Sequence, residues 1–159
     1  MKTKIILLLL IIATLIGCKY EDGPLISVRT VDRRLQGDYH AESFQIDGQN
    51  GMQIWNDSIC NDYVKIRLQD PGGAEFHFFS TIKKNDLSGA YEFSQNKKNL
   101  QLLVQWVDSC YTGFGPFKMG CSSSWKIHKL SNKRLWMQTT FKGHDYFLKL
   151  LKIKDYPKY

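Results

Sequence analysis

The chain has 159 residues and a formal net charge of +7, from 22 Lys and Arg against 15 Asp and Glu. Apolar residues make up 43% and charged residues 23% of the chain, which excludes wholesale disorder and is typical of one globular domain. Four cysteines are too few for a disulfide-dense miniprotein, and a 13% share of aromatic residues favours β structure.

The first segment, residues 1–17, has the layout of a secretory signal peptide. Lys2 and Lys4 form a basic start, and an unbroken apolar run follows from Ile5 to Ile12. The apolar stretch is too short for a transmembrane helix, which needs roughly 20 residues. We therefore expect this segment to direct export and to lie outside the folded domain.

The end of this segment, Leu15-Ile16-Gly17-Cys18, resembles the bacterial lipobox, in which a small residue precedes the cysteine that becomes lipidated. The resemblance implies that the Cys18 thiol receives a diacylglycerol and that the signal is cut before it. It also implies that the new amine is acylated, for example with palmitate. Two or three acyl chains anchor a protein stably where one does not. The alternative is an ordinary cleaved signal in which the cysteine occurs by chance.

Residues 18–29 then form the lipidated N-terminus and a tether. The implied location is the bacterial outer membrane, with the membrane itself as the partner of lipidated Cys18. Lys19 follows the cysteine, and Glu21 and Asp22 come next. A Lys followed by acids is similar to the surface-export signal of some bacterial lineages, whereas a plain polar tether is the alternative. Both the periplasmic side and the cell surface therefore stay open.

After the tether, a helical turn within 28–36 leads into a series of strands. Val31 and Leu35 stand four residues apart, and Gly37 ends the turn. Apolar and polar residues then alternate between turn-forming clusters. We expect strands over 37–47, 62–70, 74–83, 88–94, 99–107, 122–130, 133–141 and 145–154.

Two details of this series are expected from the pattern alone. In the first strand, Phe44 and Ile46 share one face and Tyr39 lies on the other. Residues 48–61 are polar and irregular, and we expect Met52, Ile54 and Trp55 to lie over one end of the domain.

The connections between the strands are mostly short, so sequential strands pair in antiparallel fashion. Eight meandering strands close well into an up-and-down barrel, which removes exposed edges. The predicted fold is all-β: one domain over 30–159 that forms an eight-stranded antiparallel barrel. A two-sheet sandwich is the alternative.

Two stretches resemble lipocalin-like lipoproteins of bacteria. Leu35-Gln36-Gly37-Asp38-Tyr39 is similar to the lipocalin entry motif, with Tyr39 in place of Trp. Residues 125–131, followed by Leu135-Trp136, resemble the late hairpin of that family. The tether around 21–27 is also similar, so the resemblance covers roughly 18–153. It implies a barrel of lipocalin-like type that binds a small apolar ligand.

The aromatic residues have two interpretations, because an eight-stranded barrel either holds a ligand or is filled by side chains. The residues predicted to line a ligand cavity are Phe76, Phe78, Tyr91, Trp106 and Trp125, with Trp136 as a further candidate. In the alternative, the barrel is filled and the protein is a surface interaction protein. It would then use its outer face or the 108–121 loop.

Motifs for catalysis are missing from the sequence. The four histidines are scattered, and no His-x-His, His-Glu-x-x-His, Cys-x-x-Cys or Gly-x-Ser-x-Gly occurs. We expect a non-catalytic protein with no cofactor, no metal site and no nucleic-acid partner, and any protein or glycan partner is unknown. The basic residues fit solvated turns and strand faces.

A disulfide between Cys110 and Cys121 is predicted, because both lie in an exported domain where disulfides persist. If the strands on either side pair in register across the loop, Trp106 opposes Trp125 and Cys110 then falls opposite Cys121. The bridge would hold the tip over 113–117 as a recognition loop. The rival pairings join Cys60 to either Cys110 or Cys121; otherwise Cys60 is buried or free.

Overall fold

The computed structural model describes residues 30–59, 63–69, 73–80, 85–94, 96–107 and 113–154. The predictions on residues 1–29, on Cys60 and on Cys110 lie outside these residues. The backbone of Trp106 is described but its side chain is not, so its predicted place in a cavity also lies outside.

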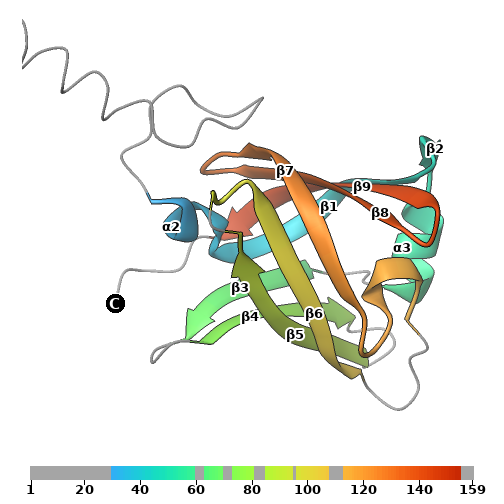
Figure 1. The fold of residues 1–159 in the computed structure, drawn as a ribbon, viewed down its shortest axis with the longest axis horizontal. Helices are drawn as coiled ribbons and strands as arrows, with labels where there is room; N and C mark the ends of the chain where they lie inside the picture. The colour runs from blue at the N-terminus through green and yellow to red at the C-terminus, as the bar shows by residue number, and fades with distance from the viewer. Residues whose placement is uncertain are drawn as a thin grey trace, which may run out of the picture.

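The domain is a closed barrel of eight antiparallel strands (Figure 1). Sequential strands are hydrogen-bonded neighbours from β1 to β9, and pairing of β1 with β9 closes the barrel; the short β2 (Gln49–Asn50) pairs only with β1. The predicted all-β meander barrel is confirmed, and the sandwich alternative is wrong. The barrel strands are β1 (Gly37–Ile46), β3 (Tyr63–Gln69), β4 (Gly73–Ser80), β5 (Asn85–Phe93), β6 (Asn99–Val107), β7 (Ser122–Leu130), β8 (Arg134–Phe141) and β9 (His144–Lys154).

A short helix, α2 (Val31–Leu35), lies at one end of the barrel and packs against β3 and β7. Its first turn is capped by the side chain of Thr30, which accepts a hydrogen bond from the Arg33 backbone N–H. The Tyr39 hydroxyl lies 2.6 Å from the Leu35 carbonyl oxygen, to which it donates. The predicted helical turn is therefore present and is tied to the first strand.

Residues 52–58 form a second helix, α3 (Met52–Ser58), at the opposite end of the barrel (Figure 1). The expectation of an irregular stretch is wrong here. Trp55 and Ile59 stand four residues apart and are both buried, as on one face of a helix. The polar residues between them, such as Asn56 and Asp57, are exposed, so the sequence looked irregular. The expectation that Trp55 covers the barrel end is met, since its side chain is only 2% exposed.

The first strand contains a β-bulge that changes which residues face inward. A register shift between Ala41 and Ser43 in the β1–β9 pair lets Tyr39 and Phe44 both enter the core, although an uninterrupted strand would put them on opposite faces. For this reason, the prediction that Tyr39 and Phe44 lie on opposite faces of the first strand is wrong. Ile46 is only partly buried.

The register between β6 and β7 also differs from the predicted one. Leu100 pairs with Trp125 and Leu102 with Ser123, six residues away from the predicted alignment. The Cys121 carbonyl oxygen accepts a hydrogen bond from the Val104 N–H, so Cys121 lies beside Val104. The described part of the preceding loop, residues 113–121, packs against the barrel, and β7 pairs with an earlier part of β6 than predicted.

This register removes the argument for a Cys110–Cys121 disulfide, and Cys121 is a free cysteine in the structure. The prediction placed Cys110 opposite Cys121 by assuming that Trp106 pairs with Trp125, but Trp125 pairs with Leu100. The structure therefore does not support the predicted bridge, and Cys110 lies outside the described residues.

Candidate ligand-binding groove

Three of the aromatic side chains predicted to line a cavity lie deep in the barrel. Phe76 and Phe78 are 1% exposed, and Trp125 is fully buried. The Phe76 and Phe78 ring centres lie 5.3 Å apart in an edge-on contact. These three side chains fill the interior, so they do not form an accessible wall.

A ring from the 108–121 loop completes this packing. Phe117, in the short helix η1 (Gly115–Phe117), is 1% exposed, and its ring centre lies 5.3 Å from that of Phe78 and 5.4 Å from that of Trp125. Gly113 and Gly115 have φ angles of +64° and +55°, which favour glycine. The chain can therefore reverse and insert the ring. The described tip of this loop is a plug for the barrel and is not a protruding recognition loop.

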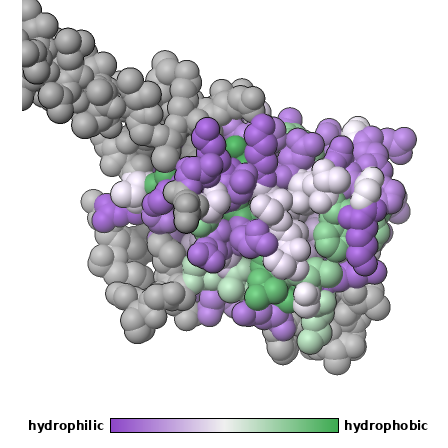
Figure 2. Space-filling model, viewed as in Figure 1, coloured by the Kyte–Doolittle hydropathy of each residue, from purple (hydrophilic) through white to green (hydrophobic). Residues whose placement is uncertain are grey.

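The fourth predicted side chain, Tyr91, lies elsewhere. It contributes to an open groove of about 630 Å³ beside β5 and β6, near α2. The apolar part of the groove comes from Ala74, Ala90, Phe93 and Leu103. Figure 2 shows hydrophobic residues gathered over β5 and β6 among hydrophilic neighbours. Leu103 is 38% exposed, so an apolar wall of the groove meets solvent.

The hydroxyl of Tyr91 is the unusual group in this groove. Tyr91 is only 5% exposed, and its Oη is shielded from solvent without a hydrogen-bond partner in the described structure. Burial raises the pKa of this hydroxyl, and the negative charge of Asp32 acts in the same direction. The hydroxyl is therefore neutral, and it has no hydrogen-bond partner among the described residues.

The polar side of the groove is an ion pair. The Lys97 ammonium lies 3.2 Å from an Asp32 carboxylate oxygen, so the β5–β6 turn is joined to α2 there. Both side chains line the groove with Tyr91. The groove thus has an apolar wall and a charged margin, the combination of surfaces that is complementary to an amphipathic molecule.

Other polar pairs lie away from this groove. The His144 Nδ1 is 2.7 Å from an Asp47 carboxylate oxygen, at the turns that join β1 to β2 and β8 to β9. This hydrogen bond, together with one from the Asp145 backbone N–H, lowers the pKa of Asp47. The pair ties two turns together. Among the described residues, no three His, Cys, Asp or Glu side chains gather as a metal site.

Trp136 lies on the outer face of β8 and is not in the groove. The Lys129 and Lys149 ammonium groups lie 4.4 and 4.7 Å from its ring centre, so two cations from β7 and β9 contact one ring. This position explains why Trp136 does not join the interior cluster.

Sequence reasoning missed Asp32, Lys97 and Leu103 as groove residues. One signal was present for Leu103, because it interrupts the alternation of Leu100, Leu102 and Val104 with an apolar residue on the outward face. The meeting of Asp32 with Lys97 had no local signal, since 65 positions separate the two residues.

No protein-family model matches the chain, and no curated protein matches it. Within the part of the chain that the structure describes, no helix has the length and apolar character needed to cross a membrane.

Proposed function

We propose that this protein is a lipid-anchored, non-catalytic binding protein of lipocalin-like type, which holds a small amphipathic ligand in the groove beside α2. The observation that carries the proposal is the open groove itself, which joins an apolar wall to the Lys97–Asp32 ion pair. Tyr91, whose shielded hydroxyl has no hydrogen-bond partner among the described residues, is one of its lining residues. A shielded polar group without a partner costs stability, about 1–3 kcal/mol, unless a ligand or water satisfies it. The proposal moves the expected ligand from the filled interior to the groove.

A surface interaction protein is the second candidate. The packed rings of Phe76, Phe78, Phe117 and Trp125 favour it, because they occupy the interior that a carrier of apolar molecules would use. In that case the outer face around Trp136 is the contact surface. Binding at the groove separates the two candidates.

The anchor is tested with Cys18→Ala. Because the thioether needs the Cys18 thiol, we expect this variant to lose labelling by a fatty-acid probe and either to leave the membrane fraction or to remain uncleaved. Cys121→Ala is the matched control, since Cys121 is a free cysteine within the described barrel, and it should label normally. Unchanged labelling and membrane partition of Cys18→Ala would contradict the anchor.

The groove is tested with the fluorescent probe 1-anilinonaphthalene-8-sulfonate, which combines apolar rings with an anion. We expect Leu103→Glu to weaken probe binding at least about fivefold, because a charge replaces apolar wall. Met119→Glu is the control, since Met119 is 65% exposed and does not line the groove. Equal binding by both variants would contradict the groove, whereas native mass spectrometry of protein from its own host would show a retained ligand directly.

Replacing Tyr91 by Phe separates the folding role of the hydroxyl from its binding role. Without ligand, we expect Tyr91→Phe to leave the unfolding free energy unchanged or to raise it by about 1 kcal/mol, because a shielded group without a partner is removed. The corresponding rise in melting temperature is roughly 2–4 °C. Probe binding should weaken about two- to tenfold. A destabilised variant with unaltered binding would show that the hydroxyl serves the fold alone.

A further inference from the structure

Charge is distributed unevenly along the barrel axis. At the end that carries α2, the basic rim consists of residues 30–38, 94–98, 131–133 and 152–154. Its described residues include seven cationic side chains against the carboxylates of Asp32 and Asp38. The seven are Arg33, Arg34, Lys97, Lys98, Lys133, Lys152 and Lys154.

The opposite end has no such excess among its described residues. Residues 47–59, 113–121 and 142–145 include the carboxylates of Asp47, Asp57 and Asp145 against the two lysines Lys118 and Lys142. Figure 1 shows α2 and α3 at the two ends of the barrel, so this difference in charge runs along its long axis. Among the described residues at the two ends, the excess of basic residues therefore lies at the end that carries α2.

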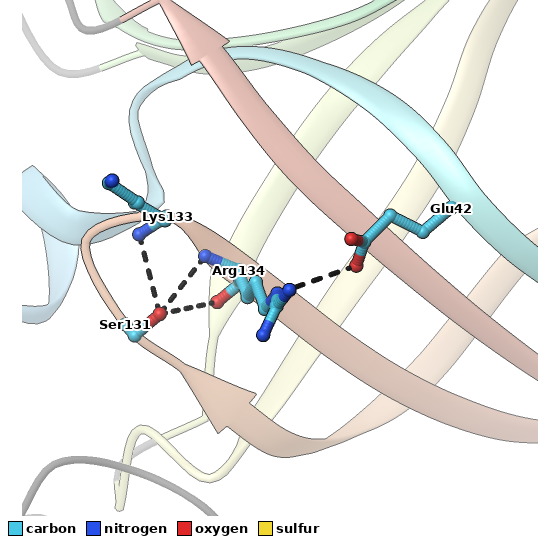
Figure 3. Close-up of polar contacts among 4 residues, drawn as sticks. All are labelled: Glu42, Ser131, Lys133 and Arg134. Carbon is cyan, nitrogen blue, oxygen red and sulfur yellow. Dashed lines mark hydrogen bonds and ion pairs between the residues drawn. The ribbon is translucent and has the colours of Figure 1, made fainter.

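Hydrogen bonds fix the backbone of the rim at the β7–β8 turn, which carries Lys133. Ser131 Oγ accepts hydrogen bonds from the backbone N–H groups of Lys133 and Arg134 in the β7–β8 turn (Figure 3). The side chain of Lys133 points away from this network. Arg134 lies 3.7 Å from Glu42, so that pair adds no net charge beside the rim.

The same region is joined across the barrel end. The Lys152 ammonium donates to the backbone carbonyl oxygens of Arg34 and Gln36, and the Lys152 backbone N–H donates to the Lys133 carbonyl oxygen. Lys98 and Lys133 are exposed, and their hydrogen bonds given by the structure are made by backbone atoms. Their charges thus face solvent from fixed positions.

The N-terminal segment joins the barrel at this same end, because Thr30 precedes α2 directly. From these observations we propose that the basic rim docks on the anionic headgroups of the membrane in which the protein is anchored. The orientation rests on the proposed anchor at Cys18. The twelve residues 18–29 limit the distance between Cys18 and the rim to at most about 40 Å.

Electrostatics favours this arrangement over a domain that turns freely on its anchor. A Lys or Arg close to an anionic lipid surface contributes about 1 kcal/mol, and the effect fades within a Debye length of about 8 Å at physiological salt. Arg34 is buried and Lys97 is paired with Asp32, but the exposed rim cations Arg33, Lys98, Lys133 and Lys154 can meet a flat surface together. The end with α3 then faces away from the membrane, and the groove, which shares Asp32 and Lys97 with the rim, begins beside the membrane-facing end.

The test uses the chain from residue 18 onward with Cys18→Ser, so that neither the signal nor a lipid contributes. The barrel closes within residues 37–154, so this chain keeps every described residue. We expect it to sediment with vesicles of phosphatidylcholine containing about a third phosphatidylglycerol at low salt, and to stay in solution with phosphatidylcholine alone. Higher salt should release it.

Lys98→Glu with Lys133→Glu should weaken binding to the anionic vesicles at least about tenfold. The matched control is Lys118→Glu with Lys142→Glu, which makes the same change in net charge at the opposite end and should retain binding within about twofold. If the rim pair does not fold by circular dichroism, Lys98→Gln with Lys133→Gln replaces it, and a loss of at least about threefold is expected.

Equal losses in the rim and control variants would overturn the proposal, because net charge alone would then explain binding. Binding without preference for anionic lipid would also overturn it. Tighter binding of the rim to dextran sulfate than to anionic vesicles would assign the rim to an acidic polysaccharide instead. A failed Cys18 labelling experiment would remove the anchor but leave the vesicle result standing, so the two failures are distinguishable.

Discussion

Phe117→Ala is expected to lower the free energy of unfolding by about 3–5 kcal/mol, the usual cost of deleting a large buried ring. The ring centre of Phe117 lies 5.7 Å from that of Trp55, and it also contacts Phe44, Phe78 and Trp125. Its removal leaves a cavity between α3 and the barrel interior. Urea denaturation followed by tryptophan fluorescence measures the change, since two of the contacts are tryptophans.

Met119→Ala is the control for that experiment, because Met119 lies two residues further along the same loop and is 65% exposed. We expect its effect to stay within about 0.5 kcal/mol. Similar losses in both variants would mean that Phe117 does not plug the barrel.

Gly89→Ala is expected to cost more than about 3 kcal/mol or to prevent folding, above the usual range for an overpacked core. A Cβ atom at this position would lie 2.0 Å from the Leu103 carbonyl oxygen and 2.9 Å from the Phe76 ring. The carbonyl belongs to the backbone of β6, so no change of side-chain rotamer relieves the contact. β5 and β6 would have to separate at the register shift between Ser88 and Gly89.

Gly143→Ala separates this collision from backbone strain. Gly143 has a φ of +84°, and no atom lies within 4 Å of the place that a Cβ would occupy. Its substitution therefore causes backbone strain without a steric collision. That strain should cost only about 1–2 kcal/mol. Thermal unfolding of both variants checks the order, and a Gly89→Ala barrel as stable as Gly143→Ala would contradict the close approach of the two strands.

The groove and the basic rim together suggest one way in which the protein could work. Asp32 and Lys97 belong to both, so a ligand in the groove would lie beside the surface that we propose to face lipid. Leu103 belongs to the groove alone, so Leu103→Glu should weaken probe binding while vesicle binding stays unchanged.

Much of the fold followed from local patterns. Alternation in residues such as Val64 and Ile66, between turns rich in Gly, Asn and Asp, predicted the eight strands, and the ends observed differ from the predicted ones by up to three residues. Short connections then left a meander as the simplest topology, and closure removes the exposed edges. The same local reasoning predicted a helical turn before Gly37.

The site could be predicted only in part, since Tyr91 was a candidate while its groove was not. Alternation predicts that Tyr91 faces inward, but not that its hydroxyl lacks a partner, because that depends on every atom packed around it. The burial of Phe117 was missed for a similar reason: a Gly-Phe-Gly-Pro-Phe run predicts a turn without saying whether the turn points inward.

The sequence by itself determined the strands, their antiparallel order and the basis for expecting an exported, lipid-anchored chain, because each of these depends on neighbouring residues. The tertiary structure decided the bulge after Ala41, the β6–β7 register that separates Cys121 from its predicted place, and the basic rim around α2. These features depend on which distant segments meet when the barrel closes. Register and charge clustering are set by that closure, which no local pattern encodes.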